Sequence, residues 1–184
     1  MGFSINDSKR QFLVKQLPAV ISLAVVPAMA KSNSDIASER SLYLYNLHTQ
    51  EQLECFYFSN GEYAPYALER INRLFRDHRT GEQHQIDRNL LDTLYVLRSQ
   101  FLSDQPIEII SGYRSASTNA MLRRNSSRVA RKSYHMSGRA VDCRFPGVPT
   151  RVLRDSAITA ARGGVGYYSS SDFVHLDTGP FRHW

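Results

Sequence analysis

The chain has 184 residues, the length of one ordinary domain with at most a short appendage. Hydrophobic residues make up 42% of it and charged residues 22%, a balance that excludes disordered and collagen-like proteins and predicts one globular core. The formal net charge of +6 allows an anionic partner, and the chain lacks the run of about 18 to 20 apolar residues that an ordinary membrane-spanning helix needs.

Residues 1–30 predict an export signal. A basic start precedes an apolar stretch over residues 17–26, and Ala28 and Ala30 provide the small side chains of a cleavage site. The basic start resembles the twin-arginine export consensus, with Lys9 at the position of the first arginine. The general secretory route and an uncleaved anchor helix are the alternatives. After cleavage, we expect no stable membrane span.

The mature chain is predicted to consist of a polar tether over residues 31–40 and a single domain over residues 41–184. Loss of the signal removes three positive charges and one negative charge, which leaves a formal charge of +4. Five basic side chains crowd residues 123–132, and such a run is either a solvated face or a surface that attracts a polyanion. No aromatic residues alternate with these arginines as nucleic-acid stacking requires, so we do not expect nucleic acid as a partner.

Strand and helix patterns follow one another in the mixed order typical of an α+β domain. Alternating polar and apolar residues over 41–58 predict a β-hairpin with its turn at residues 48–50. Apolar stripes predict two helices, one opening at Pro65 and one with Asp87 as its N-cap. The remaining elements are a buried strand ending at Gly112, a helix from about Ser115 to Arg124, a helix over residues 150–162 stopped by Gly163 and Gly164, and strands over 165–168 and 172–179.

The two cysteines, Cys55 and Cys143, lie in separate predicted strands. The oxidising compartment of an exported protein permits a disulfide between them. Because Cys143 is next to Asp142 and nothing in the sequence brings the two strands together, we favour two small buried hydrophobic side chains over a disulfide. Neither cysteine is predicted to bind a metal.

His135 and Asp142 are candidates for one metal site. On a continuous helix they would lie about 10 Å apart, too far to share an ion, and Gly138 disfavours such a helix. If the chain instead turns at residues 136–138 and enters a strand at Arg139, Asp142 can return beside His135. A lone histidine is more often a satisfied polar residue than a ligand, so a turn without a metal is the alternative.

The last predicted strand supplies a third ligand. Alternation places Phe173, His175 and Asp177 on one face, while Val174 and Leu176 point into the core. Imidazole nitrogens and a carboxylate oxygen suit Zn²⁺, and three protein ligands leave a fourth position open for water, which is the arrangement of a catalytic site.

Four motifs occur together in an order that resembles the zinc D-Ala-D-Ala metallopeptidases, and within them the periplasmic murein endopeptidases with a short catalytic domain. The resemblance covers nearly the whole chain. It implies a small α+β fold around a twisted antiparallel sheet, as in the lysostaphin and hedgehog group, with one Zn²⁺ held by His135, Asp142 and His175. The motifs are SGYRS (111–115), SYHMSGRAVD (133–142), GGVGYY (163–168) and FVHLDTGPFRHW (173–184).

The resemblance also implies a substrate, the peptide cross-links of peptidoglycan in the periplasm, where regulators could act as further partners. The bond cleaved joins either D-Ala to meso-diaminopimelate or two diaminopimelates. The alternative function is a non-catalytic zinc-bearing module of hedgehog-like fold that binds the cell wall. A nucleic-acid binder with an export signal is a third hypothesis, which rests only on the arginines.

A zinc peptidase needs a general base, and three residues are candidates. Related dipeptidases place an acidic residue three positions before the last histidine ligand, which is Asp172 here. Strand alternation favours Asp177 instead, because Asp177 shares the face of His175. We rank Asp172 first, Asp177 second and His183 third, with orientation of His175 as the alternative role of Asp177.

Arg114 matches the family's arginine that faces the substrate. A guanidinium at this place could stabilise an oxyanion or bind a substrate carboxylate, and the alternative is a surface arginine that opens a helix. Tyr167 and Tyr168, on or just past the predicted strand before Asp172, could both line the groove, and alternation between core and surface positions explains at least one of them equally well. The predicted substrate-binding residues are Arg114, Ser133, Tyr134, Tyr167 and His183.

Overall fold

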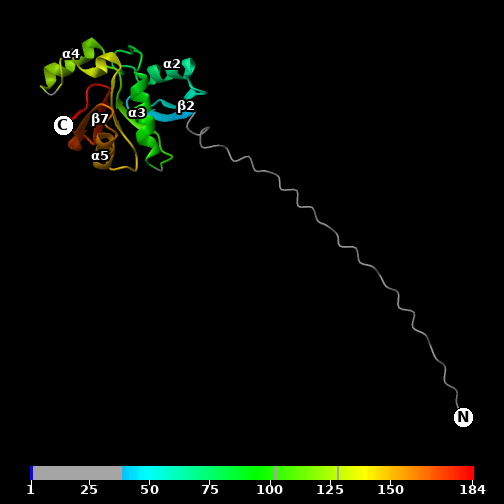
Figure 1. The fold of residues 1–184 in the computed structure, drawn as a ribbon. Coiled ribbons are helices and arrows are strands. Elements are labelled where there is room, and N and C mark those ends of the chain that lie inside the picture. Colours follow the sequence, from blue (N-terminus) through cyan, green and yellow to red (C-terminus); the bar gives the residue numbers. More distant parts are fainter. Residues whose placement is uncertain (2–38, 102, 128) are drawn as a thin grey trace. The chain divides into compact units, whose positions relative to one another are not determined.

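The computed structural model describes Met1 and residues 39–101, 103–127 and 129–184 (Figure 1). Apart from Met1, the predicted export signal lies outside the described residues, and so do residues 31–38 of the predicted tether. Within the described ranges, no helix combines the length and the apolar character that crossing a membrane requires.

In the described chain, eight strands form one sheet in the order β3-β2-β1-β4-β5-β7-β6-β8. The predicted hairpin is present as the antiparallel pair of β1 and β2. The strands are β1 (Arg40–Asn46), β2 (Gln52–Ser59), β3 (Glu62–Tyr63), β4 (Ile107–Ser111), β5 (Ala140–Arg144), β6 (Gly164–Tyr168), β7 (Phe173–Asp177) and β8 (Arg182–His183).

The predicted α+β class is confirmed, but the sheet is mixed and not wholly antiparallel. β1 pairs with β4 in parallel, and β6 pairs with β8 in parallel. In the first parallel pair, β4 runs antiparallel to β2 and therefore parallel to β1, and the segment between β2 and β4, which contains β3 and two helices, brings β4 to the other side of β1.

Four α-helices and two short 3-10 helices accompany the sheet in the part of the chain that the structure describes. Asp87 caps the second of these helices by accepting a hydrogen bond from the Asn89 backbone N–H, and Ser115 caps the third through Thr118, both at the predicted starts. The helices are α2 (Pro65–Leu74), α3 (Arg88–Ser99), α4 (Ala116–Asn125), η1 (Tyr134–Ser137), α5 (Thr150–Ala160) and η2 (Ser169–Ser171).

The end of α5 differs from its predicted position. The helix stops at Ala160, and Ala161 takes the left-handed conformation with φ 50°. The prediction was that Gly163 and Gly164 would end the helix. Gly163 serves the next strand, because a Cβ there would lie 1.8 Å from the Asp177 carbonyl oxygen. Thus Gly163 permits the close approach of the chain to the end of β7 just before β6 begins.

The helices α2, α3 and α5 pack against the sheet and form the hydrophobic core with one of its faces (Figure 1). Leu42 and Leu44 of β1 belong to this core, as do Val174 and Leu176 of β7, and each is at most 2% exposed. His175 lies between the last two residues and therefore faces away from the core. The opposite face of β5 and β7 is left for polar side chains.

Cys55 and Cys143 are both free cysteines. Cys143 lies in the core, where burial raises the pKa of its thiol, and Cys55 is partly buried against the same core. The prediction of a small buried hydrophobic side chain is confirmed for Cys143 and is partly met by Cys55.

Candidate metal centre and its pocket

The chain turns at the predicted place between His135 and Asp142. His135 lies in η1, and Gly138 ends this helix with φ 67°. A Cβ at position 138 would lie 2.1 Å from the Gln85 carbonyl oxygen, so both the backbone conformation and the space require glycine. The chain then enters β5 at Ala140, which brings Asp142 back toward η1.

Pairing of β5 with β7 brings the third residue to the same place. The two strands are antiparallel, and Asp142 lies directly opposite His175 in their register. Side chains directly opposite each other project from the same face of a sheet. The predicted convergence of two adjacent strands is therefore present.

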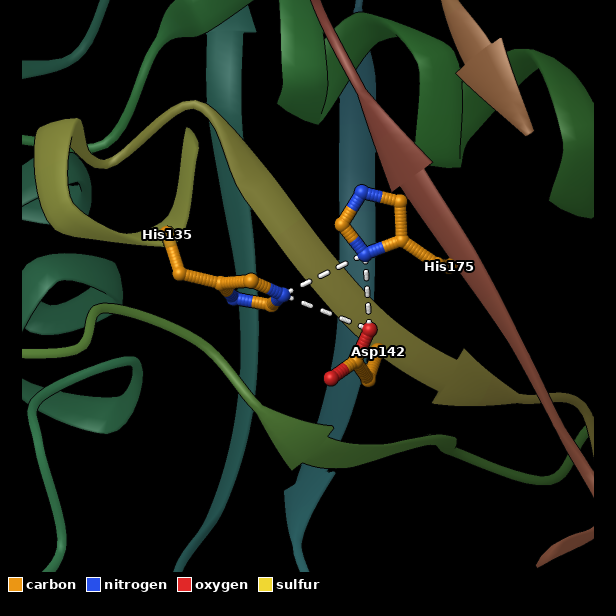
Figure 2. Close-up of side chains that lie close together, drawn as sticks. All are labelled: His135, Asp142 and His175. Carbon is orange, nitrogen blue, oxygen red and sulfur yellow. Dashed lines mark hydrogen bonds and ion pairs between the residues drawn. The ribbon is translucent and has the colours of Figure 1, made fainter. Parts of the chain in front are cut away.

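Three donor atoms from these elements face one another (Figure 2). His135 Nε2 lies 3.2 Å from His175 Nδ1 and 3.3 Å from Asp142 Oδ1, and the last two atoms are 2.8 Å apart. Ligands at about 2.0–2.2 Å from a tetrahedral ion are separated by about 3.3–3.6 Å, close to the two separations of His135, and the shorter one is that of a hydrogen bond between His175 and Asp142. The residues are only 2%, 8% and 9% exposed for His135, Asp142 and His175. These separations fit three ligands of one metal ion.

Hydrogen bonds behind the donor atoms fix the tautomer of each histidine. His135 Nδ1 donates to the Gly112 carbonyl oxygen over 2.7 Å, and His175 Nε2 donates to Asp177 Oδ2 over 3.0 Å. The nitrogens that remain, His135 Nε2 and His175 Nδ1, are those that face Asp142. Metal-binding histidines typically donate their second nitrogen to a carbonyl or carboxylate in this way.

Burial and hydrogen bonding together set the charges of the three side chains. Burial lowers the pKa of His135, so its imidazole is neutral at neutral pH. Burial opposes ionisation of Asp142, but His135 and His175 outweigh it and lower the pKa of that carboxyl. Burial also opposes charge on His175, yet hydrogen bonds to Asp142 and Asp177 raise its pKa to about 9. With this pKa His175 holds a second proton at neutral pH, and a metal ion at His175 would have to displace it.

A pocket of about 500 Å³ opens onto the three donor atoms. Among its described lining residues, Asp142 is the sole carboxylate, and three side chains are basic. The described lining consists of Arg114, Ser126, Val129, Ala130, Lys132, Ser133, Tyr134, His135, Asp142, Tyr168, Phe173, His175, Arg182 and Trp184. Of the predicted substrate-binding residues, the pocket thus includes Arg114, Ser133 and Tyr134.

Backbone hydrogen bonds of residues 114 and 115 hold Arg114 beside the three donor atoms. Its N–H donates to the His135 carbonyl oxygen over 3.1 Å, and its Nη2 lies 3.7 Å from Asp142 Oδ2. The next residue, Ser115, donates its backbone N–H to the buried carboxylate of Asp77 over 2.9 Å. These bonds direct the guanidinium toward the pocket, so Arg114 is not the exposed surface arginine that was the alternative.

Two predicted substrate-binding residues lie outside the described lining. Tyr167 pairs with Val174 and packs against the core, with the Arg154 guanidinium 4.7 Å from its ring centre on the other side. Its neighbour Tyr168 pairs with Phe173 and lines the pocket. His183 is exposed and lies beside Phe181. Strand alternation decides which tyrosine lines the pocket: Tyr167 lies opposite Val174, whose side chain points into the core, so Tyr167 faces the core as well.

The two acidic candidates for the general base lie at the two ends of β7. Asp177 has a fully buried side chain that accepts the His175 hydrogen bond, which fixes the orientation of the imidazole. Asp172 has a left-handed backbone with φ 51° and a carboxylate that accepts a hydrogen bond from the Thr150 hydroxyl over 2.9 Å. Its side chain is 63% exposed and is not part of the described pocket lining.

Sequence reasoning missed the closing segment of the pocket. Arg182 and Trp184 line it, because β8 pairs in parallel with β6 and thereby returns beside His175. The rings of Trp184 and His175 have centres 5.4 Å apart. A two-residue strand has no period to detect, so no local signal in the sequence predicts this return.

The family model and the similar proteins found by comparison carry the same description. A family model described as peptidoglycan L,D-endopeptidase MepK matches residues 34–184. The protein named peptidoglycan L,D-endopeptidase MepK in Escherichia coli is 39% identical over 178 residues, which cover 97% of this chain and 98% of the relative. A Haemophilus influenzae protein, named probable peptidoglycan L,D-endopeptidase MepK, is 38% identical over 182 residues, which cover 98% of this chain and 97% of the relative. No solved structure matches the chain.

Proposed function

The chain belongs to the family described as peptidoglycan L,D-endopeptidase MepK, and from this premise we propose that it is a zinc-dependent endopeptidase that hydrolyses peptide cross-links of peptidoglycan. The main observation in support is that the donor atoms of His135, Asp142 and His175 lie together at the wall of a pocket of about 500 Å³. A purely structural metal site would instead be closed by a fourth protein ligand.

The cross-link that we favour joins two diaminopimelates. In that bond an L-centre carbonyl meets a D-centre amine, whereas the bond from D-Ala to diaminopimelate joins two D centres. The relatives carry L,D-endopeptidase in their names, which supports the first bond. Diaminopimelate also presents free carboxylates, and Arg114 and Lys132 give the pocket basic side chains to receive them.

His135, Asp142 and His175 would hold the zinc ion. The chemistry that a bound Zn²⁺ supplies is polarisation of a carbonyl group and acidification of water. Nitrogen and oxygen donors at these separations suit zinc, and the fixed tautomers leave a lone pair on each histidine directed at the shared centre. The guanidinium of Arg114, 3.7 Å from Asp142, is placed to bind the oxygen on which negative charge develops.

Asp172 is the residue that we propose as the proton acceptor. Its carboxylate is 63% exposed and is held by the Thr150 hydroxyl and, at 3.6 Å, by Arg144, so a change of side-chain rotamer can release it. The carboxylate of Asp177, by contrast, is buried and bonded on both oxygens. Catalytic hydrogen bonds are often incomplete before substrate binds, which is consistent with the position of Asp172 beside the pocket residue Phe173.

The periplasm is the compartment in which we place the reaction. The substrate class lies there, and residues 1–30 have the pattern of an export signal. The twin-arginine route and the general secretory route would both deliver the domain to that compartment.

The test is mass spectrometry of purified cross-linked muropeptide dimers after incubation with the protein. We expect dimers linked through two diaminopimelates to become monomers, and we expect a zinc chelator to stop the reaction and added zinc to restore it. Dimers linked through D-Ala serve as the comparison substrate, and monomers with a terminal D-Ala test for carboxypeptidase activity. Zinc binding without cleavage of either dimer would replace the proposal with a non-catalytic cell-wall binding module.

A further inference from the structure

Arg182 of β8 binds the carboxylate of Asp177, which lies behind the candidate metal centre. Its Nη1 lies 3.0 Å from Asp177 Oδ1, and its Nη2 lies 2.7 Å from Asp177 Oδ2. Such a two-point contact between a guanidinium and a carboxylate fixes the plane of the carboxylate as well as its position. Asp177 Oδ2 is also the atom that accepts the hydrogen bond from His175 Nε2.

The other contacts of Asp177 do not fix that second oxygen. The backbone N–H groups of Gly164 and Gly179 donate to Oδ1, over 3.3 Å and 2.8 Å. Among the described residues, the hydrogen-bond partners of Oδ2 are His175 and Arg182. Without the guanidinium, Oδ2 would turn about the anchored Oδ1, and the imidazole of His175 would turn with it.

Arg182 itself lies near two aromatic rings. Its guanidinium carbon lies 5.4 Å from the centre of the Tyr134 ring and 5.0 Å from the centre of the Trp184 ring. A guanidinium at these distances from ring faces is attracted by cation–π interaction. Both rings line the pocket, so the same contacts join the back of the metal centre to the pocket wall.

Two glycines of β6 leave the space that this arrangement occupies. A Cβ on Gly164 would lie 2.4 Å from Arg182 Nη1 and 2.5 Å from Asp177 Oδ2. A Cβ on Gly166 would lie 2.7 Å from the Trp184 ring. In the register, Gly164 lies opposite Asp177 and Gly166 opposite His175. The strand next to β7 therefore lacks side chains at the two positions where Arg182 and Trp184 lie.

We propose that Arg182 is a positioning residue for the metal centre, which acts through Asp177 to hold the His175 imidazole with Nδ1 directed at the metal. The inference rests on the proposed zinc site and adds a residue that lies outside the three ligands. It explains why an arginine stands at this place, since a lysine would bind one carboxylate oxygen and leave the other free to turn.

The test compares zinc affinity, by competition with a chelator, in the full-length protein and in Arg182→Met. We expect the dissociation constant for zinc to rise about tenfold, the lower end of the range seen when a group behind a metal ligand is removed. Arg182→Lys should lie between the two. In the zinc-loaded protein, the His175 Nε2–H proton should be visible by NMR and should broaden in Arg182→Met, because its acceptor is no longer fixed.

Arg154→Met is the matched control. Arg154 also forms an ion pair, 2.6 Å from Asp155, and also lies over a ring, that of Tyr167, but it is outside the described pocket lining. Its zinc affinity should equal that of the parent protein. Gly164→Ala disturbs the same ion pair from the side of β6, since the added Cβ would crowd both Arg182 Nη1 and Asp177 Oδ2. It should also weaken zinc binding, even if Arg182→Met does not fold.

The outcomes separate this inference from the proposed function. If the parent protein does not bind zinc, the proposed zinc site itself is wrong. If the parent binds zinc and folded Arg182→Met and Gly164→Ala bind it within twofold of the parent, the positioning role of Arg182 is wrong and the zinc site stands. An equal loss of affinity in Arg154→Met would also overturn the inference, because the effect would then be one of general stability.

Discussion

Asp172 immediately precedes β7 and Asp177 ends it, and the two carboxylates are held in contrasting ways. Asp177 has no exposed side-chain surface and binds His175, Arg182 and two backbone N–H groups. Asp172 is largely exposed and binds the Thr150 hydroxyl and the more distant Arg144. A carboxylate bonded on every side can orient a neighbour but cannot reach a substrate, whereas a loosely held one can move to accept a proton. The contrast predicts distinct consequences for each end of the strand.

The largest effect is expected midway between the two ends, at His175. His175→Ala removes a donor atom and should lower the rate of dimer cleavage by more than about 1,000-fold together with zinc affinity. Cleavage assays and chelator competition measure the two quantities. His48→Ala, in the exposed turn between β1 and β2, is the control and should match the parent. Retention of both activity and zinc affinity in His175→Ala would remove His175 from the centre.

At the loosely held end, Asp172→Asn should separate chemistry from metal binding. The loss of a general base typically lowers the rate by about 10²–10⁴-fold, and we expect a fall of this size in kcat with unchanged zinc affinity. Asp155→Asn, an exposed carboxylate on α5, is the matched control. If Asp172→Asn retains the parent kcat, another residue accepts the proton and the comparison between the two ends fails.

At the locked end, Asp177→Asn should act on the metal. The variant loses the anionic acceptor of His175 Nε2–H, and removal of such a partner costs about 10–100-fold in metal affinity. Chelator competition gives the affinity, and cleavage at saturating zinc shows whether activity recovers. Recovery is expected, because Asp177 does not touch the substrate in our proposal. A loss of kcat that excess zinc does not restore would instead make Asp177 the general base.

The smallest effect is the pH dependence of the zinc-free protein. The pKa of His175 is raised to about 9 from 6.5, so its protonated form stabilises the fold fully below pH 6.5. That stabilisation, on the order of 3 kcal/mol, is lost as pH rises toward 9. Thermal unfolding of the zinc-free protein between these values should show a falling Tm. A Tm that rises over this interval would show that His175 is neutral between its two carboxylates.

Local sequence signals predicted much of the fold and the approach of His135, Asp142 and His175 to one another. Asp87 and Ser115 begin helices because each cap binds an N–H group two or three residues away, and Gly138 turns the chain because its left-handed backbone favours glycine. Strand alternation placed His175 away from the core. Each of these inferences depends on residues close together in the chain.

Other features depend on contacts between distant segments and were not predicted. The parallel pairing of β1 with β4 joins strands that are separated in the chain by β2, β3 and two helices. The left-handed cap at Ala161 shows that an alanine can take a position that favours glycine. Register decided that Tyr168 and not Tyr167 lines the pocket, because Tyr168 lies opposite Phe173. No periodicity within β6 alone could settle which side faces the metal centre.

Signals within short segments of the chain are enough to predict the α+β class and the residue types of the proposed metal centre, because periodicity, capping and turn chemistry act over a few residues. The groups that surround these residues come from contacts between distant segments. The Gly112 carbonyl behind His135, the Arg182 guanidinium behind Asp177 and the Trp184 ring beside His175 come from different elements. Their positions depend on which strands become neighbours and in which register, and those choices are made by packing of the whole sheet.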